Sequence, residues 1–122
     1  MGNIEKERKE YKMLNQVIIV GKIIEQPTLI KLDNGNSKTE VKLSIPRMTK
    51  DEESRDIVSD ILVCTFRDEI AENVVEYCKK GTTVGLKARL ESKEILCLDK
   101  TTQFCSIIVG EKVTYINVKK ED

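Results

Sequence analysis

The chain has 122 residues, a length that suits one domain with a single hydrophobic core. Basic and acidic residues number 21 each, so the formal net charge is zero, which excludes a protein attracted to nucleic acid by its overall charge. No apolar run approaches the roughly 18 residues that a membrane-spanning helix needs, and the first residues are charged where a secretory signal would be apolar. We therefore expect a cytoplasmic protein without a membrane partner.

The chain begins with a charged stretch, residues 1–12, which has too few apolar residues to bury a face and is predicted to be an extension. A strand is predicted from Leu14 to Ile24, where β-branched residues are frequent. Between Val17 and Val20 both faces of this strand are apolar, which indicates a subunit contact. The candidate oligomer interface consists of Leu14, Val17, Ile18, Ile19 and Val20.

The next two strands are predicted around a polar loop. Apolar and polar residues alternate over residues 38–47, which predicts a half-buried strand ending at Pro46, after a turn at residues 33–36. Residues 48–56 lack apolar periodicity and predict a surface loop. Strand composition resumes over residues 57–66, which we expect to pair with the preceding strand.

A helix is predicted to follow these strands. Asp68 can cap its start. Apolar residues recur every three or four residues, at Ile70, Val74 and Tyr77 with Cys78, so they are expected to face the core. The remaining segments of strand composition are residues 82–92 and 103–110, followed by a short edge segment at residues 113–118.

Five strands with one helix between the third and the fourth are the order of the OB fold, a five-stranded Greek-key barrel. The predicted fold class is therefore all-β with one helix. The OB domain is expected to span residues 13–118, followed by a short charged end at residues 119–122.

Patterns for catalysis and for metal binding are missing from the sequence. Histidine is absent, and there is neither a G-x-S-x-G motif nor a P-loop. The four cysteines include no C-x-x-C pair, which argues against zinc and is typical of reduced structural thiols. We expect no enzymatic activity and no cofactor.

Two segments resemble the bacterial single-stranded DNA-binding protein family. MLNQVIIVGKIIEQPTL at Met13–Leu29 is similar to the opening pattern MLN-V-LVG-L---P-L, and AENVVEYCKKGTTVGLKARL at Ala71–Leu90 is similar to AENV---L-KG-LV---G-L. The resemblance implies an OB fold that binds single-stranded DNA without sequence preference, in replication, recombination or repair. It also implies assembly through the first strand, with a homotetramer favoured over a dimer.

Binding of a single strand requires a cationic groove for the phosphates and flat side chains for the bases. Basic residues recur over residues 38–47 and 87–93, whereas acidic residues gather at 51–60 and 68–69, and this segregation would suit a local groove. The resemblance places Lys22, Arg47 and Arg89 at basic positions of the family, and neighbouring candidates are Lys42, Lys87 and Lys93. Alternatively, each of these residues only solvates a strand face.

The stacking positions differ from those of the family. Where its members carry aromatic residues, this chain has Thr49, Ile61, Arg67 and Ile95. Phe66 lies one residue away and could contact bases through a small bulge, or it could point into the core. The guanidinium planes of Arg67 and Arg47 can stack on bases, and Phe104 is a weaker candidate. We therefore expect weaker and more salt-sensitive binding than in typical members.

A second hypothesis is an OB-fold protein-interaction module, or a primosomal accessory protein, with weak or lost DNA binding. It predicts an exposed apolar patch around Ile61 and Ile95. The chain ends shortly after the last predicted strand, where family members carry a flexible tail with an acidic tip, so we expect a trimmed domain or a tail-less branch. The expected partners are single-stranded DNA in the nucleoid, further copies of the chain, and replication or mobile-element proteins.

Overall fold

The structure is a computed structural model that describes residues 13–50 and 57–117. The predicted extension at 1–12 and the charged C-terminal end lie outside the described residues, as does most of the predicted loop at 48–56. The elements along the chain are β1 (Val17–Ile23), β2 (Ile30–Lys31), β3 (Ser37–Lys50), β4 (Ile57–Arg67), α2 (Asp68–Tyr77), β5 (Thr83–Leu96) and β6 (Thr102–Asn117).

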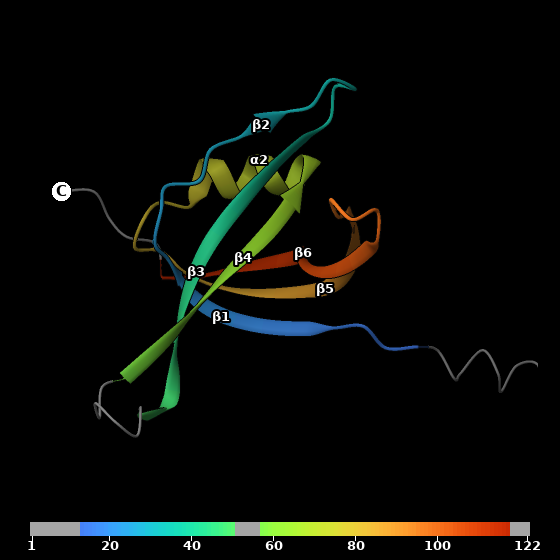
Figure 1. Cartoon of the computed structure of the whole chain (residues 1–122). Helices are drawn as coiled ribbons and strands as arrows, with labels where there is room; N and C mark the ends of the chain where they lie inside the picture. Colours follow the sequence, from blue (N-terminus) through green and yellow to red (C-terminus); the bar gives the residue numbers. More distant parts are fainter. Residues whose placement is uncertain (1–12, 51–56, 118–122) are drawn as a thin grey trace, which may run out of the picture.

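Five of the described strands close into a barrel (Figure 1). β1 pairs antiparallel with both β5 and β3, β3 pairs antiparallel with β4, and β5 pairs antiparallel with β6. A short parallel pairing between β4 and β6 completes the ring, and β2 adds two residues to the edge of β3. The helix α2 lies between β4 and β5 in the sequence, so the predicted OB barrel with one helix after the third long strand is confirmed.

The core forms because apolar residues alternate with polar ones along the strands. Side chains from four barrel strands and from α2 meet inside the barrel, and all of them are nearly inaccessible to solvent. The innermost residues are Ile23, Val41, Leu43, Cys64, Phe66, Ala71, Val74, Cys78 and Ala88. This single core matches the one expected for a chain of this length.

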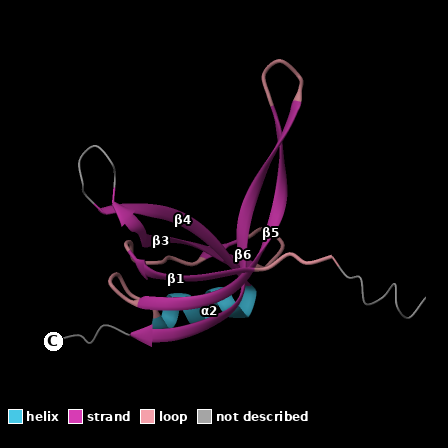
Figure 2. Ribbon diagram, turned by 90° about the horizontal axis from the view of Figure 1, so that it is seen from below, coloured by secondary structure: helices cyan, strands magenta, loops and turns pink. Residues whose placement is uncertain are grey.

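The last two strands are longer than predicted. β5 continues to Leu96 and pairs with the start of β6 at Thr102, so the turn between them is much shorter than the expected connection. The two strands rise from the barrel as a two-stranded arm (Figure 2).

Near the barrel, Lys87 pairs with Lys112 whereas Ala88 pairs with Gly110, so β6 has one extra residue in a β-bulge. Beyond this bulge β6 runs on to Asn117, and the prediction of a separate edge segment is wrong.

Two expectations about α2 are wrong. Asp68 does not cap the helix; its Oδ1 accepts a hydrogen bond from the backbone N–H of Ser37 at 3.2 Å, which ties the start of the helix to β3. Tyr77 is 53% exposed and meets Tyr115 edge-on, with ring centroids 6.0 Å apart. The buried position at this end of α2 is taken by the adjacent Cys78, which the periodicity also predicted to face the core.

The four cysteines are free thiols. Cys64 and Cys78 are buried, and burial raises the pKa of each thiol to about 11, so these two are inert structural residues. In the part of the chain that the structure describes, no group of side chains is arranged to hold a metal ion. None of the helices described there is long and apolar enough to cross a membrane.

Phe66 is a core residue, so the prediction that it contacts bases is wrong. Its ring is 2% exposed and lies over Gly110 of β6. A Cβ atom added to Gly110 would come within 2.5 Å of Cδ1 of this ring, which is closer than two carbon atoms can pack. Phe66 therefore points inward with the alternation of β4, and glycine on β6 makes room for it.

We expect Gly110→Ala to lower the free energy of unfolding by about 1–3 kcal/mol, because the new methyl group would displace a buried ring. Chemical denaturation followed by circular dichroism measures this change. Gly85→Ala is the matched control, because its Cβ would meet the end of the exposed Ile116 side chain at 3.2 Å and Cγ2 of the exposed Val20 at an ordinary 3.7 Å, and no buried ring. Equal losses in the two variants would contradict a special role for the Phe66–Gly110 contact.

Candidate nucleic-acid interface

An open groove of about 340 Å³ runs over four strands of the barrel. Two lysines and one arginine line it together with two carboxylates, and the remaining walls are small or apolar. The lining residues are Lys38 and Glu40 of β3, Thr65 and Arg67 of β4, Glu91, Ser92 and Lys93 of β5, and Ile107 of β6. The groove is thus built from residues that are distant in the sequence.

Strand alternation places the charged side chains of this groove on the outside. Because Val41 is buried inside the barrel, Lys38 and Glu40 lie on the outer face of β3. Arg67 pairs directly with Lys38 across the two strands and is also exposed. Lys38 belongs to the basic run in the sequence, but it is not among the predicted binding residues. It could have been found from its even spacing to Lys42, because residues an even number apart lie on the same face of a strand.

The arginines near the groove are already bound to carboxylates. Arg67 donates from Nη1 and Nη2 to the two oxygens of Glu91, at 3.1 and 3.0 Å. Arg89 also donates to Glu91, and it donates to Glu111 of β6 at 3.1 Å. These hydrogen bonds, first from Arg67 and then from Arg89, lower the pKa of Glu91, and the two carboxylates raise the pKa of Arg89.

The other cations predicted on β3 are paired too, and they lie outside the lining of the groove. Arg47 donates from Nη2 to Oδ1 of Asp60 at 2.7 Å and from Nε to Oδ2 at 3.0 Å, which lowers the pKa of the aspartate. Lys42 donates to Glu25 at 3.2 Å. The expected segregation of basic from acidic residues is therefore wrong, because strand pairing brings carboxylates from other parts of the sequence beside these cations.

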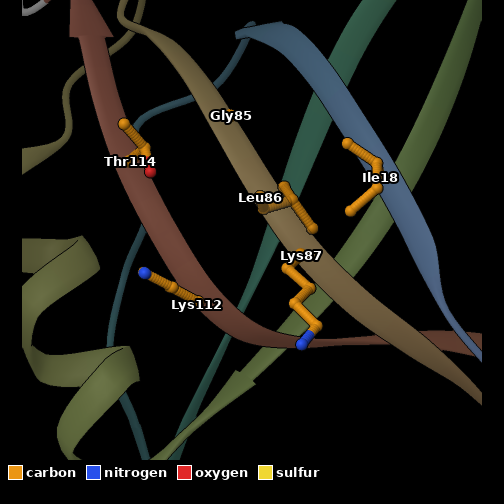
Figure 3. A pocket seen from close by; sticks show the side chains of 6 residues that line it. All are labelled: Ile18, Gly85, Leu86, Lys87, Lys112 and Thr114. Carbon is orange, nitrogen blue, oxygen red and sulfur yellow. The ribbon is translucent and has the colours of Figure 1, made fainter.

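Two predicted cations are directed to other surfaces. Lys87 lines a hollow on the outer face of β1, β5 and β6, where it lies beside Ile18 and opposite Lys112 (Figure 3). Lys22 lines another hollow between β1 and β3, next to Ser44. Of the predicted cations, the groove itself therefore contains only Arg67 and Lys93, with Arg89 held at its edge through Glu91.

Two of the four expected stacking positions carry exposed aliphatic side chains. Ile61 on β4 is 52% exposed and Ile95 on the arm is 43% exposed, while the side chain of Thr49 lies outside the described part of the structure. Phe104, on the arm, is 69% exposed, so it is the more accessible of the two phenylalanines. The surface of β4 and of the arm thus offers apolar contact for bases, and the arm adds the exposed ring of Phe104.

The outer face of β1 is apolar, but not all of the predicted interface residues lie on it. Ile18 and Val20 are 65% and 53% exposed, and Leu14, ahead of the strand, is 91% exposed. Ile19 is buried in the core and Val17 packs against it, so including these two residues in an outer contact is wrong. Alternation along a strand requires this division, because neighbouring side chains point to opposite faces.

The closed five-stranded barrel with its helix and its outward-facing cationic groove defines an OB-fold protein with a surface suited to an anionic polymer. Residues 14–116 match the model of the single-strand binding protein family, and the chain belongs to this family.

Similar proteins are known from several bacteria. Single-stranded DNA-binding protein 1 of Clostridium acetobutylicum is 26% identical over 109 residues, which cover 88% of this chain and 98% of that protein. Single-stranded DNA-binding protein B of Bacillus subtilis is 27% identical over 90% of this chain and 96% of its own length. Among solved structures, the Plasmodium falciparum SSB complex with ssDNA is similar to this chain with a TM-score of 0.69 and 17% sequence identity. The match covers 87% of this chain and 97% of that one, and the similarity supports the fold.

We expect Arg67→Gln to raise the pKa of Glu91 towards its ordinary value, because Arg67 contributes most to lowering it. Titration of the carboxyl carbons by NMR measures this change. Asp60 serves as the internal control, since its low pKa depends on Arg47 and should not move. An unchanged pKa at Glu91 would show that Arg89 alone holds the carboxylate.

The same shift makes a small contribution to stability that depends on pH. Because the pKa of Glu91 is lower in the folded than in the unfolded chain, this contribution is present above the unfolded value and is lost as the pH falls through the folded value.

Proposed function

We propose that the protein binds single-stranded DNA without sequence preference. The observation that carries this proposal is the groove over β3, β4, β5 and β6, with Lys38, Arg67 and Lys93 on its walls, in a member of the single-strand binding protein family. The names of its relatives in Clostridium acetobutylicum and Bacillus subtilis agree with this function. Such binding would serve replication, recombination or repair in the cytoplasm, and it requires no catalytic step.

In this proposal the groove binds the backbone of the strand. Lys38 and Lys93 make no hydrogen bond or ion pair with the described residues, so their ammonium groups are available for phosphates. Arg67 adds a third cation, and Arg89 extends the positive surface along β5. Phosphates are the same in every nucleotide, so these contacts carry no sequence information.

The bases would rest against the apolar surface next to the groove. Ile61 and Val63 are exposed on the outer face of β4, and Phe104 is exposed on the arm. Aliphatic side chains lack a flat ring, and stacking of a base on an aromatic ring contributes about 1–3 kcal/mol. Binding should therefore depend more on phosphate contacts, and hence on salt, than in relatives with aromatic platforms.

We expect Lys38→Gln with Lys93→Gln to weaken binding to a labelled dT oligonucleotide roughly tenfold, because two phosphate contacts are lost. A plot of the logarithm of the affinity against the logarithm of the salt concentration should also have a less negative slope. We expect the slope to change by about 1.4, or 0.7 for each lost contact. Fluorescence anisotropy at several salt concentrations, with duplex of equal length as competitor, measures both quantities.

The control for this experiment is Lys80→Gln with Lys112→Gln, which removes the same charge away from the groove. An equal loss in both double variants would contradict binding at the groove. Failure of the unaltered protein to bind the oligonucleotide at low salt would contradict the proposed function and favour a protein-interaction module.

We also propose that the chain forms a homotetramer, or a dimer, through the outer face of β1. Leu14, Ile18 and Val20 are largely exposed there, and Val20 lies opposite Gly85, beside the exposed Ile116. A contiguous apolar surface of this kind is typical of a contact between protein molecules.

We expect Val20→Glu to dissociate this assembly, because a carboxylate would be buried at the contact, and neither Gly85 opposite it nor Ile116 beside it can neutralise its charge. Sedimentation equilibrium measures the effect as a fall in mass towards that of the 13.9 kDa chain. Ile61→Glu is the matched control, since it introduces the same charge at a similarly exposed isoleucine on β4. A monomeric unaltered protein would overturn the proposed assembly.

A further inference from the structure

Glu91 links two arginines that come from different strands. Arg67 of β4 contacts both of its carboxylate oxygens, and Arg89, two residues along β5, contacts one of them. The carboxylate side chain is 29% exposed, less than those of the two arginines at 45% and 38%. Glu91 is thus enclosed between two guanidinium groups at the wall of the groove.

These contacts use the part of each guanidinium group that best recognises phosphate. Arginine binds carboxylate and phosphate in the same way, through parallel N–H groups directed at two oxygens. In Arg67 the terminal nitrogens Nη1 and Nη2 both point at Glu91, and in Arg89 they are divided between Glu111 and Glu91. A phosphate that approaches these nitrogens would meet a carboxylate already in place.

The pairing also cancels the local charge. Arg67 and Arg89 contribute two positive charges, and Glu91 and Glu111 contribute two negative charges, so the network as a whole is neutral. Lys38 and Lys93, by contrast, are the cations of the groove without a carboxylate partner among the described residues. The lysines can bind phosphate at once, whereas the arginines must first exchange one anion for another.

We propose that Glu91 limits the affinity of the groove for single-stranded DNA by occupying the guanidinium edges of Arg67 and Arg89 at which phosphates would bind. This inference rests on the proposed function and assigns Glu91 a role in regulating its strength. Exchange is feasible because ion pairs at the surface are weak, about 0–1 kcal/mol each, and are screened by salt. The carboxylate therefore weakens binding without preventing it.

The test is Glu91→Gln, which keeps the shape of the side chain and removes its charge. We expect binding to a labelled dT oligonucleotide to become about three- to tenfold tighter, the equivalent of one or two exposed ion pairs. We also expect the salt dependence to become steeper by about 0.7 for each additional phosphate contact. Fluorescence anisotropy at several salt concentrations measures both effects.

The matched control is Glu40→Gln, which removes one negative charge from the same groove at a residue that makes no hydrogen bond or ion pair with the described residues. It should tighten binding less than Glu91→Gln does, because it frees no arginine. The double variant Arg67→Gln with Glu91→Gln should lose most of the gain. Thermal denaturation of each variant confirms that it is folded.

If folded Glu91→Gln and Glu40→Gln bind the oligonucleotide with equal affinity, the inference is overturned. Weaker binding by Glu91→Gln would also overturn it, because the carboxylate would then position the arginines for binding. Either result leaves the proposed function intact if the unaltered protein binds DNA. If the unaltered protein does not bind, the proposed function fails, and binding gained only by Glu91→Gln would still support competition. Absence of binding in every variant would overturn both.

Discussion

The close approach of β4 and β6 is the constraint on which the rest of the structure depends. These strands pair in parallel, at Cys64 with Ile108 and at Thr65 with Val109, whereas the other described strand pairs are antiparallel. Next to this pairing the ring of Phe66 occupies the space that a Cβ at position 110 of β6 would need, so glycine at this position accommodates the ring. The pairing closes the barrel, and the groove has walls only because β3, β4, β5 and β6 meet there.

The surface charges are organised by the pairing of the strands. Each described arginine contacts a carboxylate of another strand: Arg47 and Arg89 each contact one on the adjacent strand, and Arg67 contacts Glu91 of β5 across the intervening β6. Arg89 also contacts Glu91 on its own strand, whereas Lys38 and Lys93 have no such contact with the described residues. A groove of this kind attracts an anionic polymer through its lysines and offers further cations only after its own carboxylates move. This arrangement is consistent with a chain whose basic and acidic residues are equal in number.

The proposed contact with bases would differ from an aromatic platform in its physical origin. Aliphatic side chains such as Ile61 and Val63 contribute area that is removed from water, but they have no π face to stack on a base. Affinity then depends on charge, and charge is screened by salt. The exposed ring of Phe104 could stack on a base, but it lies on the arm, opposite Glu94, rather than on the barrel.

Several residues could be placed correctly before the structure was known, and others could not. Alternation around Val41 predicted the inner face of β3, and periodicity predicted the buried Val74 of α2. The arm was missed because its residues are largely exposed on both faces and therefore show no clear period. Periodicity could not place Tyr77, because it does not decide which of two adjacent apolar residues, Tyr77 or Cys78, faces the core.

Local patterns in the amino-acid sequence were enough to predict the class of the fold, the inward residues of most strands and the family. These follow from local patterns, in which each residue is compared with its near neighbours. Only the tertiary structure decided that Phe66 is core, that Lys38 joins the groove and that Glu91 lies between two arginines. Those outcomes depend on strand register and barrel closure, which bring residues together from distant parts of the chain and which local patterns do not encode.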